Sequence, residues 1–86
     1  MSQIWLHIRE QSSSDDRRHI QQAVRSMEAC GLVAFDGDWY EQRRMRVLEG
    51  RVSELPLHTK SPVQVQAYLR KAVGDTCWVE RQASAF

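Results

Sequence analysis

The segment IWLHIRE, residues 4–10, alternates between apolar side chains and side chains of other kinds. Successive side chains of a β-strand point to opposite faces, so this alternation predicts a strand with one buried face. The inner set is expected to be Ile4, Leu6 and Ile8, and the outer set Trp5, His7 and Arg9. The pattern therefore indicates a sheet, and not a helix, at the start of the chain.

A helix is predicted over about residues 14–30. It follows the loop QSSS, in which Ser13 or Ser14 can act as the N-cap, and two acids come next, where the helix dipole favours negative charge. Gly31 suits the position just after the last turn. The apolar positions recur with the spacing of a single helical face, and they are Ile20, Ala23, Val24 and Met27.

A second helix is predicted over residues 61–73. Ser61 can cap it, Pro62 falls at the first helical position, where its missing N–H is not needed, and Gln64 falls where a capping box places its partner. Gly74 is expected to end it. The inward stripe is expected to consist of Val65, Tyr68, Leu69 and Ala72.

The segment between these helices is interpreted as a hairpin. LVAF, residues 32–35, is an apolar run of strand type, and the Asp-Gly-Asp sequence at 36–38 signals a tight turn. The second half of WYEQRRMRVL, residues 39–48, alternates again, which predicts a strand with Met45 and Val47 inside and Arg44 and Arg46 outside. A turn at 49–50, a short strand at 51–55 and a loop at 56–60 are expected to follow.

DTCWVER, residues 75–81, predicts a last strand, with Cys77 and Val79 inside and Trp78 outside. The element order is then strand, helix, strand, strand, helix, strand, which in 86 residues is the ferredoxin-like split βαβ arrangement. We expect one α+β domain over residues 1–86, with 81–86 as a tail. Its four-stranded antiparallel sheet would carry two helices on one face and leave the other face open.

The open face is the predicted working surface. In this topology the first strand lies between the third and the last, so the outward side chains become neighbours, and they are Trp5, His7, Arg9, Arg44, Arg46 and Trp78. Tryptophan and arginine are enriched in interface hot spots. The sequence therefore indicates a small non-enzymatic regulator, inhibitor or accessory subunit that binds a protein partner or itself. The alternative is that the loop after Leu55 or the C-terminal tail covers this face.

A second hypothesis is nucleic-acid binding through Arg43, Arg44 and Arg46 together with Trp5 and Trp78. VRSMEACGLVAFDGDWYEQRRMRVLEG, residues 24–50, resembles the recognition helix and wing of winged-helix regulators, which implies that the arginines contact phosphates. The resemblance departs upstream, where a strand and a loop replace two helices. The formal net charge of +1 disfavours a duplex-DNA binder. RRMRVLEG, residues 43–50, has no glycine or aromatic residue at the positions where the third strand of RNA-recognition motifs carries them.

A third hypothesis is a small-molecule sensor or minor enzyme with a pocket lined by His7 or by the loop of Asp36 and Asp38. These two acids could hold Mg²⁺, although a tight turn also favours them. Cys30 and Cys77 have no metal-ligand spacing and are expected to be reduced, buried thiols. No cofactor, metal or membrane partner is indicated, and a cytoplasmic location is expected.

Overall fold

The computed structural model describes residues 2–81, and these form an α+β fold of four strands and three helices. The elements are β1 (Ser2–Ile8), α1 (Ser14–Ala29), β2 (Val33–Ala34), α2 (Gly37–Leu48), β3 (Glu54–Thr59), α3 (Pro62–Val73) and β4 (Cys77–Arg81), with a 3₁₀ turn, η1 (Gly74–Thr76), between α3 and β4. The strands form one open antiparallel sheet in the order β2-β3-β1-β4. Arg81, expected to begin a tail, is the last residue of β4, and residues 82–86 lie outside the described part.

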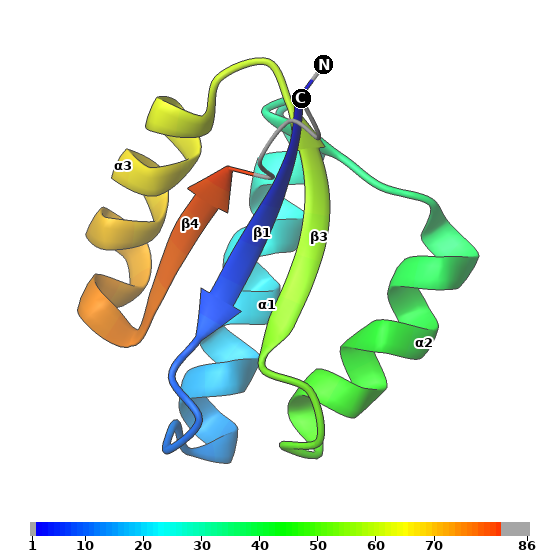
Figure 1. Cartoon of the computed structure of the whole chain (residues 1–86), viewed down its shortest axis with the longest axis vertical. Coiled ribbons are helices and arrows are strands. Elements are labelled where there is room, and N and C mark those ends of the chain that lie inside the picture. Colours follow the sequence, from blue (N-terminus) through cyan, green and yellow to red (C-terminus); the bar gives the residue numbers. More distant parts are fainter. Residues whose placement is uncertain (1, 82–86) are drawn as a thin grey trace.

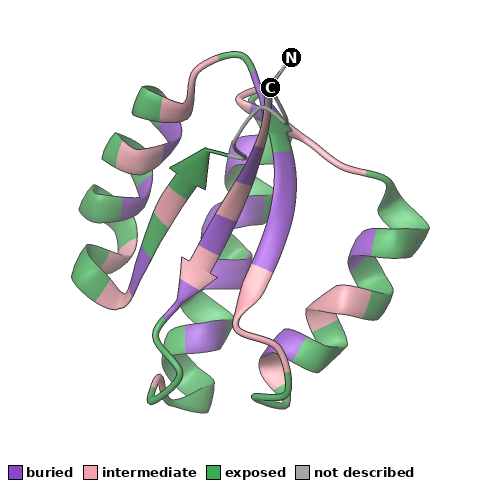
Figure 2. Ribbon diagram, in the orientation of Figure 1, coloured by how far each residue is buried: buried purple, intermediate pink, exposed green. Residues whose placement is uncertain are grey.

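The predicted alternation of the first strand is confirmed. Ile4 pairs with Leu57 and Leu6 with Leu55 across β1 and β3, and all four side chains are fully buried. On the other side Ile8 pairs with Cys77 of β4, which is also buried. Figure 2 shows the resulting alternation of buried and part-exposed residues along β1. The inner face of the sheet therefore forms one core with the helices behind it (Figure 1).

The first and last helices form where they were predicted. Ser13 caps α1 in a capping box with Asp16, and Ser61 caps α3 with Pro62 at its first turn. The predicted stripe of α1 is entirely buried. In α3 only half of the stripe is confirmed, because Val65 and Leu69 are buried whereas Tyr68 and Ala72 are exposed.

The predicted hairpin strand at residues 39–48 is wrong, because residues 37–48 form α2. The side chain of Asp36 accepts the N–H of Trp39 at 3.0 Å, so the acid that suggested a turn caps a helix instead. Val47 is buried as expected, but Met45 is exposed. A winged-helix reading fails at the same place, since a helix occupies the position of the wing.

Figure 1 shows α2 alongside β3. β2 pairs with β3 at Val33–Thr59 and Ala34–His58, and in the described part of the chain no other strand pairs with β3 on that side. A proline is tolerated in a strand at such an edge. This explains why Pro56 lies within β3, although its presence suggested a loop over residues 56–60.

A buried arginine ties three segments of the core together. Arg17 of α1 is only 2% exposed. Its guanidinium donates to the carbonyl oxygens of Val47 (3.0 Å), Val52 (3.1 Å) and Glu10 (3.2 Å). These contacts join the end of α2 and the segments that lead out of β1 and into β3 to a single side chain on α1.

Candidate functional site

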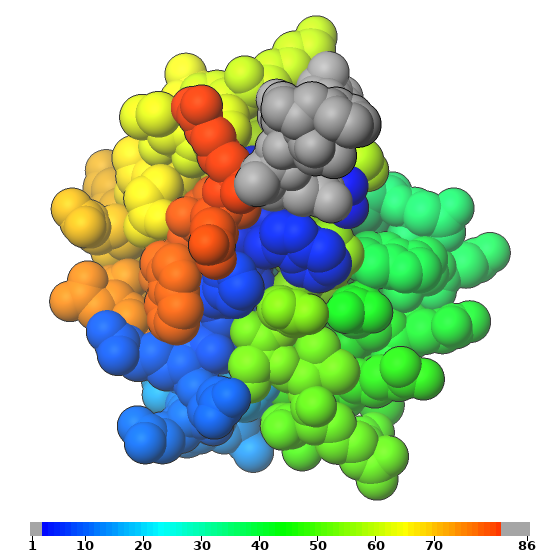
Figure 3. Space-filling view, in the orientation of Figure 1, coloured from blue at the N-terminus to red at the C-terminus, as the bar shows by residue number. Residues whose placement is uncertain are grey.

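The open face of the sheet carries the predicted tryptophans. His7 of β1 pairs with Trp78 of β4 across the sheet, and the two rings stack with centroids 5.5 Å apart and an interplanar angle of 18°. His7 Nε2 lies 2.7 Å from Glu80 Oε2 on the same strand as Trp78. Trp5, two residues before His7 on β1, shares this face and pairs with Glu80. Figure 3 looks directly onto this face.

Arg9 also lies where it was predicted to lie. Its guanidinium carbon is 5.9 Å from the ring centroid of Trp78, and its Nε donates to the carbonyl oxygen of Asp75 at 2.8 Å. The backbone bond fixes the guanidinium beside the indole, a geometry in which a cation is attracted to the aromatic face. Trp78 is therefore flanked by His7 and Arg9 and remains 42% exposed.

A third tryptophan, which the sequence analysis did not single out, extends this surface from α2. Trp39 lines a hollow of about 250 Å³ together with Pro56 and His58 of β3. Pro56 in turn pairs with Trp5 of β1. The five residues that follow one another across α2, β3, β1 and β4 are here called the open-face cluster: Trp39, Pro56, Trp5, His7 and Trp78.

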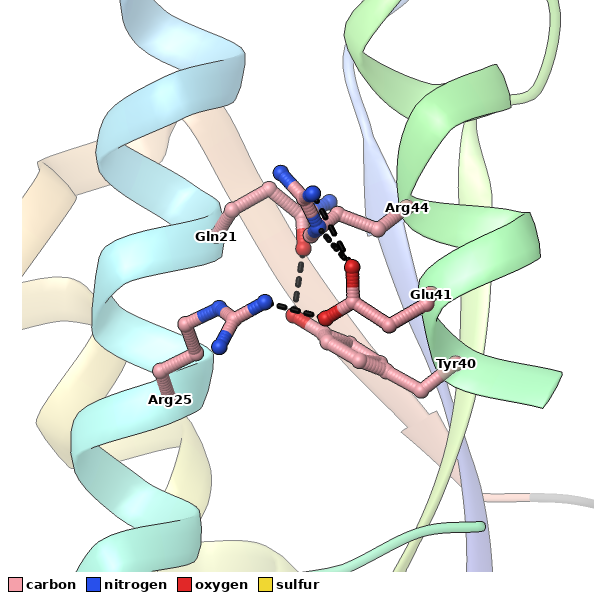
Figure 4. Close-up of polar contacts among 5 residues, drawn as sticks. All are labelled: Gln21, Arg25, Tyr40, Glu41 and Arg44. Atoms are coloured by element: carbon pink, nitrogen blue, oxygen red, sulfur yellow. Dashed lines mark hydrogen bonds and ion pairs between the residues drawn. The ribbon is translucent and has the colours of Figure 1, made fainter. Parts of the chain in front are cut away.

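Arg44 was predicted on the open face, and the structure places it elsewhere. It pairs with Glu41, with Nη2 at 3.0 Å and Nε at 3.1 Å from Oε2, while Arg25 of α1 binds the other carboxylate oxygen (Figure 4). The hydrogen bond from Arg44 holds the pKa of Glu41 below its usual range. Arg44 therefore takes part in the contact between α1 and α2, because the helical turn rotates it away from the sheet.

Arg46 was also expected on a strand and lies on α2 instead. It is exposed, and it lines a small hollow of about 80 Å³ with Trp39, Gln42 and Arg43. Residues 39, 42, 43 and 46 follow the spacing of one helical face. That spacing is the sequence signal that would have placed Arg46 next to Trp39 rather than next to Arg44.

Arg43 joins α2 to the open face. Its guanidinium carbon is 5.6 Å from the ring centroid of Trp39, and Nη2 is 4.0 Å from a carboxylate oxygen of Glu54 on β3. Its Nε is buried, with no hydrogen-bond partner among the described residues. Arg43 therefore links α2 to β3, and its charge is partly compensated by Glu54.

A hollow of about 710 Å³ opens at the end of the open-face cluster. His7 and Trp78 form one side of it, and residues 50–54 form the other. Its charged lining is of both signs, with Glu10 and Glu54 against Arg43 and Arg51. This mixed polar lining differs from that of drug-sized ligand sites, which are mostly apolar.

The other residues considered for chemistry have structural roles. Asp36 caps α2, and Asp38 lies in its first turn. Within residues 2–81 no cluster of three or more histidine, cysteine or acidic side chains could hold a metal ion. Cys77 is buried as expected, whereas Cys30 is exposed because it follows the last turn of α1, and both thiols are free.

Comparisons of the chain with protein-family models, curated proteins and solved structures find no match. None of the helices within residues 2–81 is both long and apolar enough to span a bilayer.

Proposed function

We propose that this chain is a non-enzymatic interaction protein that binds a protein partner, or a second copy of itself, through the open-face cluster. The observation that carries this proposal is the convergence of three tryptophans from three elements on one side of the sheet. Tryptophan is the residue type most enriched at interface hot spots, and such anchors are surrounded by polar residues that exclude water. Arg9, Arg43, Glu54 and Glu80 supply such a polar border.

The arrangement of the arginines favours a protein partner over a nucleic acid. Phosphate binding needs cationic side chains aligned on one surface and free to reach the backbone. Arg44 is paired with Glu41 on the side of α1, and Arg43 is partly paired with Glu54. Only Arg46 of the three is exposed without an ion-pair partner among the described residues.

We also propose that the fold is a variant of the ferredoxin-like arrangement in which α2 is inserted between β2 and β3, the two strands of the central hairpin. The strand order β2-β3-β1-β4 and the two antiparallel neighbours of β1 support this reading. The extra helix would then enlarge the open face by adding Trp39 beside Pro56. An experimental structure tests the proposal, because it has to retain this strand order.

Affinity capture with matched variants tests the function. The immobilised protein, the Trp5→Ala/Trp78→Ala double variant and a Tyr68→Ala control are each incubated with cell extract and with an untagged copy of the chain. Tyr68 is a suitable control because it is 37% exposed on α3, away from the open-face cluster. We expect one protein, or the untagged copy, to be retained by the wild type and the control and lost by the double variant.

The salt dependence of the retained complex separates the two classes of partner. A tryptophan-centred protein interface should persist between about 50 and 200 mM salt, whereas phosphate-driven binding falls by orders of magnitude over this range. Retention by all three proteins would contradict a role of the open-face cluster. Loss of binding with salt, together with co-purifying nucleic acid, would establish the second hypothesis instead.

A further inference from the structure

β4 is an edge strand of the sheet. It pairs with β1 on one side, and among residues 2–81 no strand pairs with its other side. An exposed edge presents backbone N–H and C=O groups that can pair with another chain. Figure 1 shows that α3 runs next to this edge, so a chain that paired with β4 would lie against α3.

At the free edge of β4, a side chain accepts a backbone hydrogen bond that a neighbouring strand would otherwise accept. The N–H of Val79 donates to Gln66 Oε1 of α3 at 2.8 Å. An amide oxygen in this position is chemically equivalent to the peptide carbonyl of an added strand. Because it is a side chain, Gln66 can turn away and release the backbone donor.

A groove of about 570 Å³ lies between α3 and this edge. Its apolar part consists of Pro62, Val63, Ala67 and Val79, and Val63 is 70% exposed. Every second side chain of an added strand would point into this groove, just as every second side chain of β1 points into the core. Backbone pairing beside side-chain pockets is a recurring mode of peptide recognition.

Among residues 2–81, the charged residues that line the groove are all cations. Arg70 and Lys71 lie in the last turn of α3, beside the start of β4, and Arg81 lies at the end of β4. No ion pair within residues 2–81 involves any of the three. The groove therefore has an apolar centre and a positive charge at each end, which is complementary to an acidic chain.

We propose that the groove between α3 and the free edge of β4 binds an extended acidic segment of a partner protein, which adds to the sheet as a further strand. Its inward side chains would be acidic, apolar and acidic at alternate positions, to match Arg70 and Lys71, then Val63 and Ala67, then Arg81. Binding would displace the amide of Gln66 from Val79. The open-face cluster takes no part in this site.

Fluorescence anisotropy with a synthetic probe tests the proposal. The probe is a labelled nine-residue peptide whose central residues are glutamate, threonine, valine, threonine and glutamate, and the control peptide carries lysines in place of the glutamates. We expect saturable binding of the acidic probe to the full chain and at least tenfold weaker binding of the basic one. Absence of saturable binding, or equal binding of both peptides, would overturn the proposal.

Protein variants locate the site. Arg70→Glu/Lys71→Glu should weaken binding about tenfold or more, whereas Arg18→Glu/Arg51→Glu, which changes the net charge equally, should have less than a twofold effect. Val63→Asp should also weaken binding. Gln66→Ala should strengthen it about twofold to tenfold, because the peptide no longer competes with a hydrogen bond of the protein.

The same titration distinguishes this groove from the open-face cluster. Trp5→Ala should leave the affinity for the probe unchanged, even if it abolishes capture of a protein partner. If Trp5→Ala weakens binding while Arg70→Glu/Lys71→Glu does not, the peptide binds the open face and the proposal fails. Weaker binding to Gln66→Ala would likewise contradict displacement of the Gln66 amide.

Discussion

The two faces of this sheet are formed by the same strands, because successive residues of each strand point to opposite faces. Ile4 and Leu6 are fully buried against the helices, whereas Trp5, between them, shares the open face with the 42% exposed Trp78. The difference shows how a short chain can separate its tasks. One face is fixed by the need for a core, and the other leaves Trp78 exposed to solvent, where the proposed interface would form.

The largest effect on stability is expected from a charge placed on the side of the sheet that packs against the helices. Met27→Asp puts an unpaired carboxylate into the core, because Met27 is fully buried. We expect a loss of several kcal/mol in the free energy of unfolding, out of a total of about 5–15 kcal/mol for a typical domain. Met45→Asp is the matched control at a 49% exposed position of α2. Urea denaturation of both variants measures the effect, and equal losses would contradict the assignment.

Arg17→Met tests whether the helix side also depends on its buried polar contacts. The substitution keeps much of the volume but removes the donors to Val47, Val52 and Glu10. We expect a loss of about 2–4 kcal/mol, since hydrogen bonds to charged groups contribute more than neutral ones. Arg18→Met, at an exposed position, should change stability by less than about 1 kcal/mol. Similar losses in both variants would show that the buried contacts of Arg17 add little.

Tyr40→Phe probes the contact between α1 and α2. The hydroxyl of Tyr40 donates to Gln21 Oε1 in a buried position (Figure 4). Its removal leaves the oxygen of Gln21 without this partner, so we expect a loss of about 1–2 kcal/mol at neutral pH. Thermal denaturation measures it, with Tyr68→Phe as the exposed control. A neutral effect would mean that water replaces the hydroxyl.

Stability should also fall at alkaline pH because of two buried groups. Burial raises the pKa of Tyr40 from 10.0 to about 12 and the pKa of the Cys77 thiol from 9.0 to about 12. The unfolded chain releases these protons first, so the native state binds more protons and the free energy of unfolding decreases as the pH rises from about 9 towards 12. Tyr40→Phe and Cys77→Ala should each flatten this decrease, as denaturation at a series of pH values will show. Unchanged slopes would contradict the burial of these groups.

The smallest effect on stability is expected on the open face. Trp78→Ala removes the stacking with His7 and the contact with Arg9, which together contribute about 1 kcal/mol. The loss in the free energy of binding to a partner should be larger, at about 2 kcal/mol or more. Calorimetry of folding and of binding on the same variant compares the two. A folding loss above about 3 kcal/mol would make Trp78 a core residue and remove the contrast between the faces.

The sequence predicted those parts of the fold whose signals are strong and local. Capping residues, a regular apolar stripe and period-two alternation placed α1, the start of α3, and β1. α2 was missed because its inward positions are sparse. Tyr40 and Val47 are buried one heptad apart, but Arg43 and Arg44 stand between them, so no apolar stripe is visible. In the short window from Arg44 to Val47, alternation alone does not distinguish a strand from a helix.

The candidate site was predicted in the same uneven way. The alternation along β1 and β4 was interpreted correctly, and it placed four residues on the open face: Trp5, His7, Arg9 and Trp78. Arg44 and Arg46 were misplaced because their positions depended on the period of α2. Pro56 and Trp39 could not be assigned to this surface from the sequence, because α2 was predicted as a strand and residues 56–60 as a loop. Only the fold shows that the two residues line the same hollow.

The position of β1 in the chain has a consequence for the order of events in folding. This central strand comes first, yet its partners arrive much later, with Ile4 opposite Leu57 and Leu6 opposite Val79. At about 5–20 residues per second, a ribosome delivers β3 several seconds after β1. During that interval the apolar side of β1 has α1 as its neighbour and no strand to pair with. Early helix formation followed by slow closure of the sheet is the expected course, since distant contacts have to be brought together before they stabilise the chain.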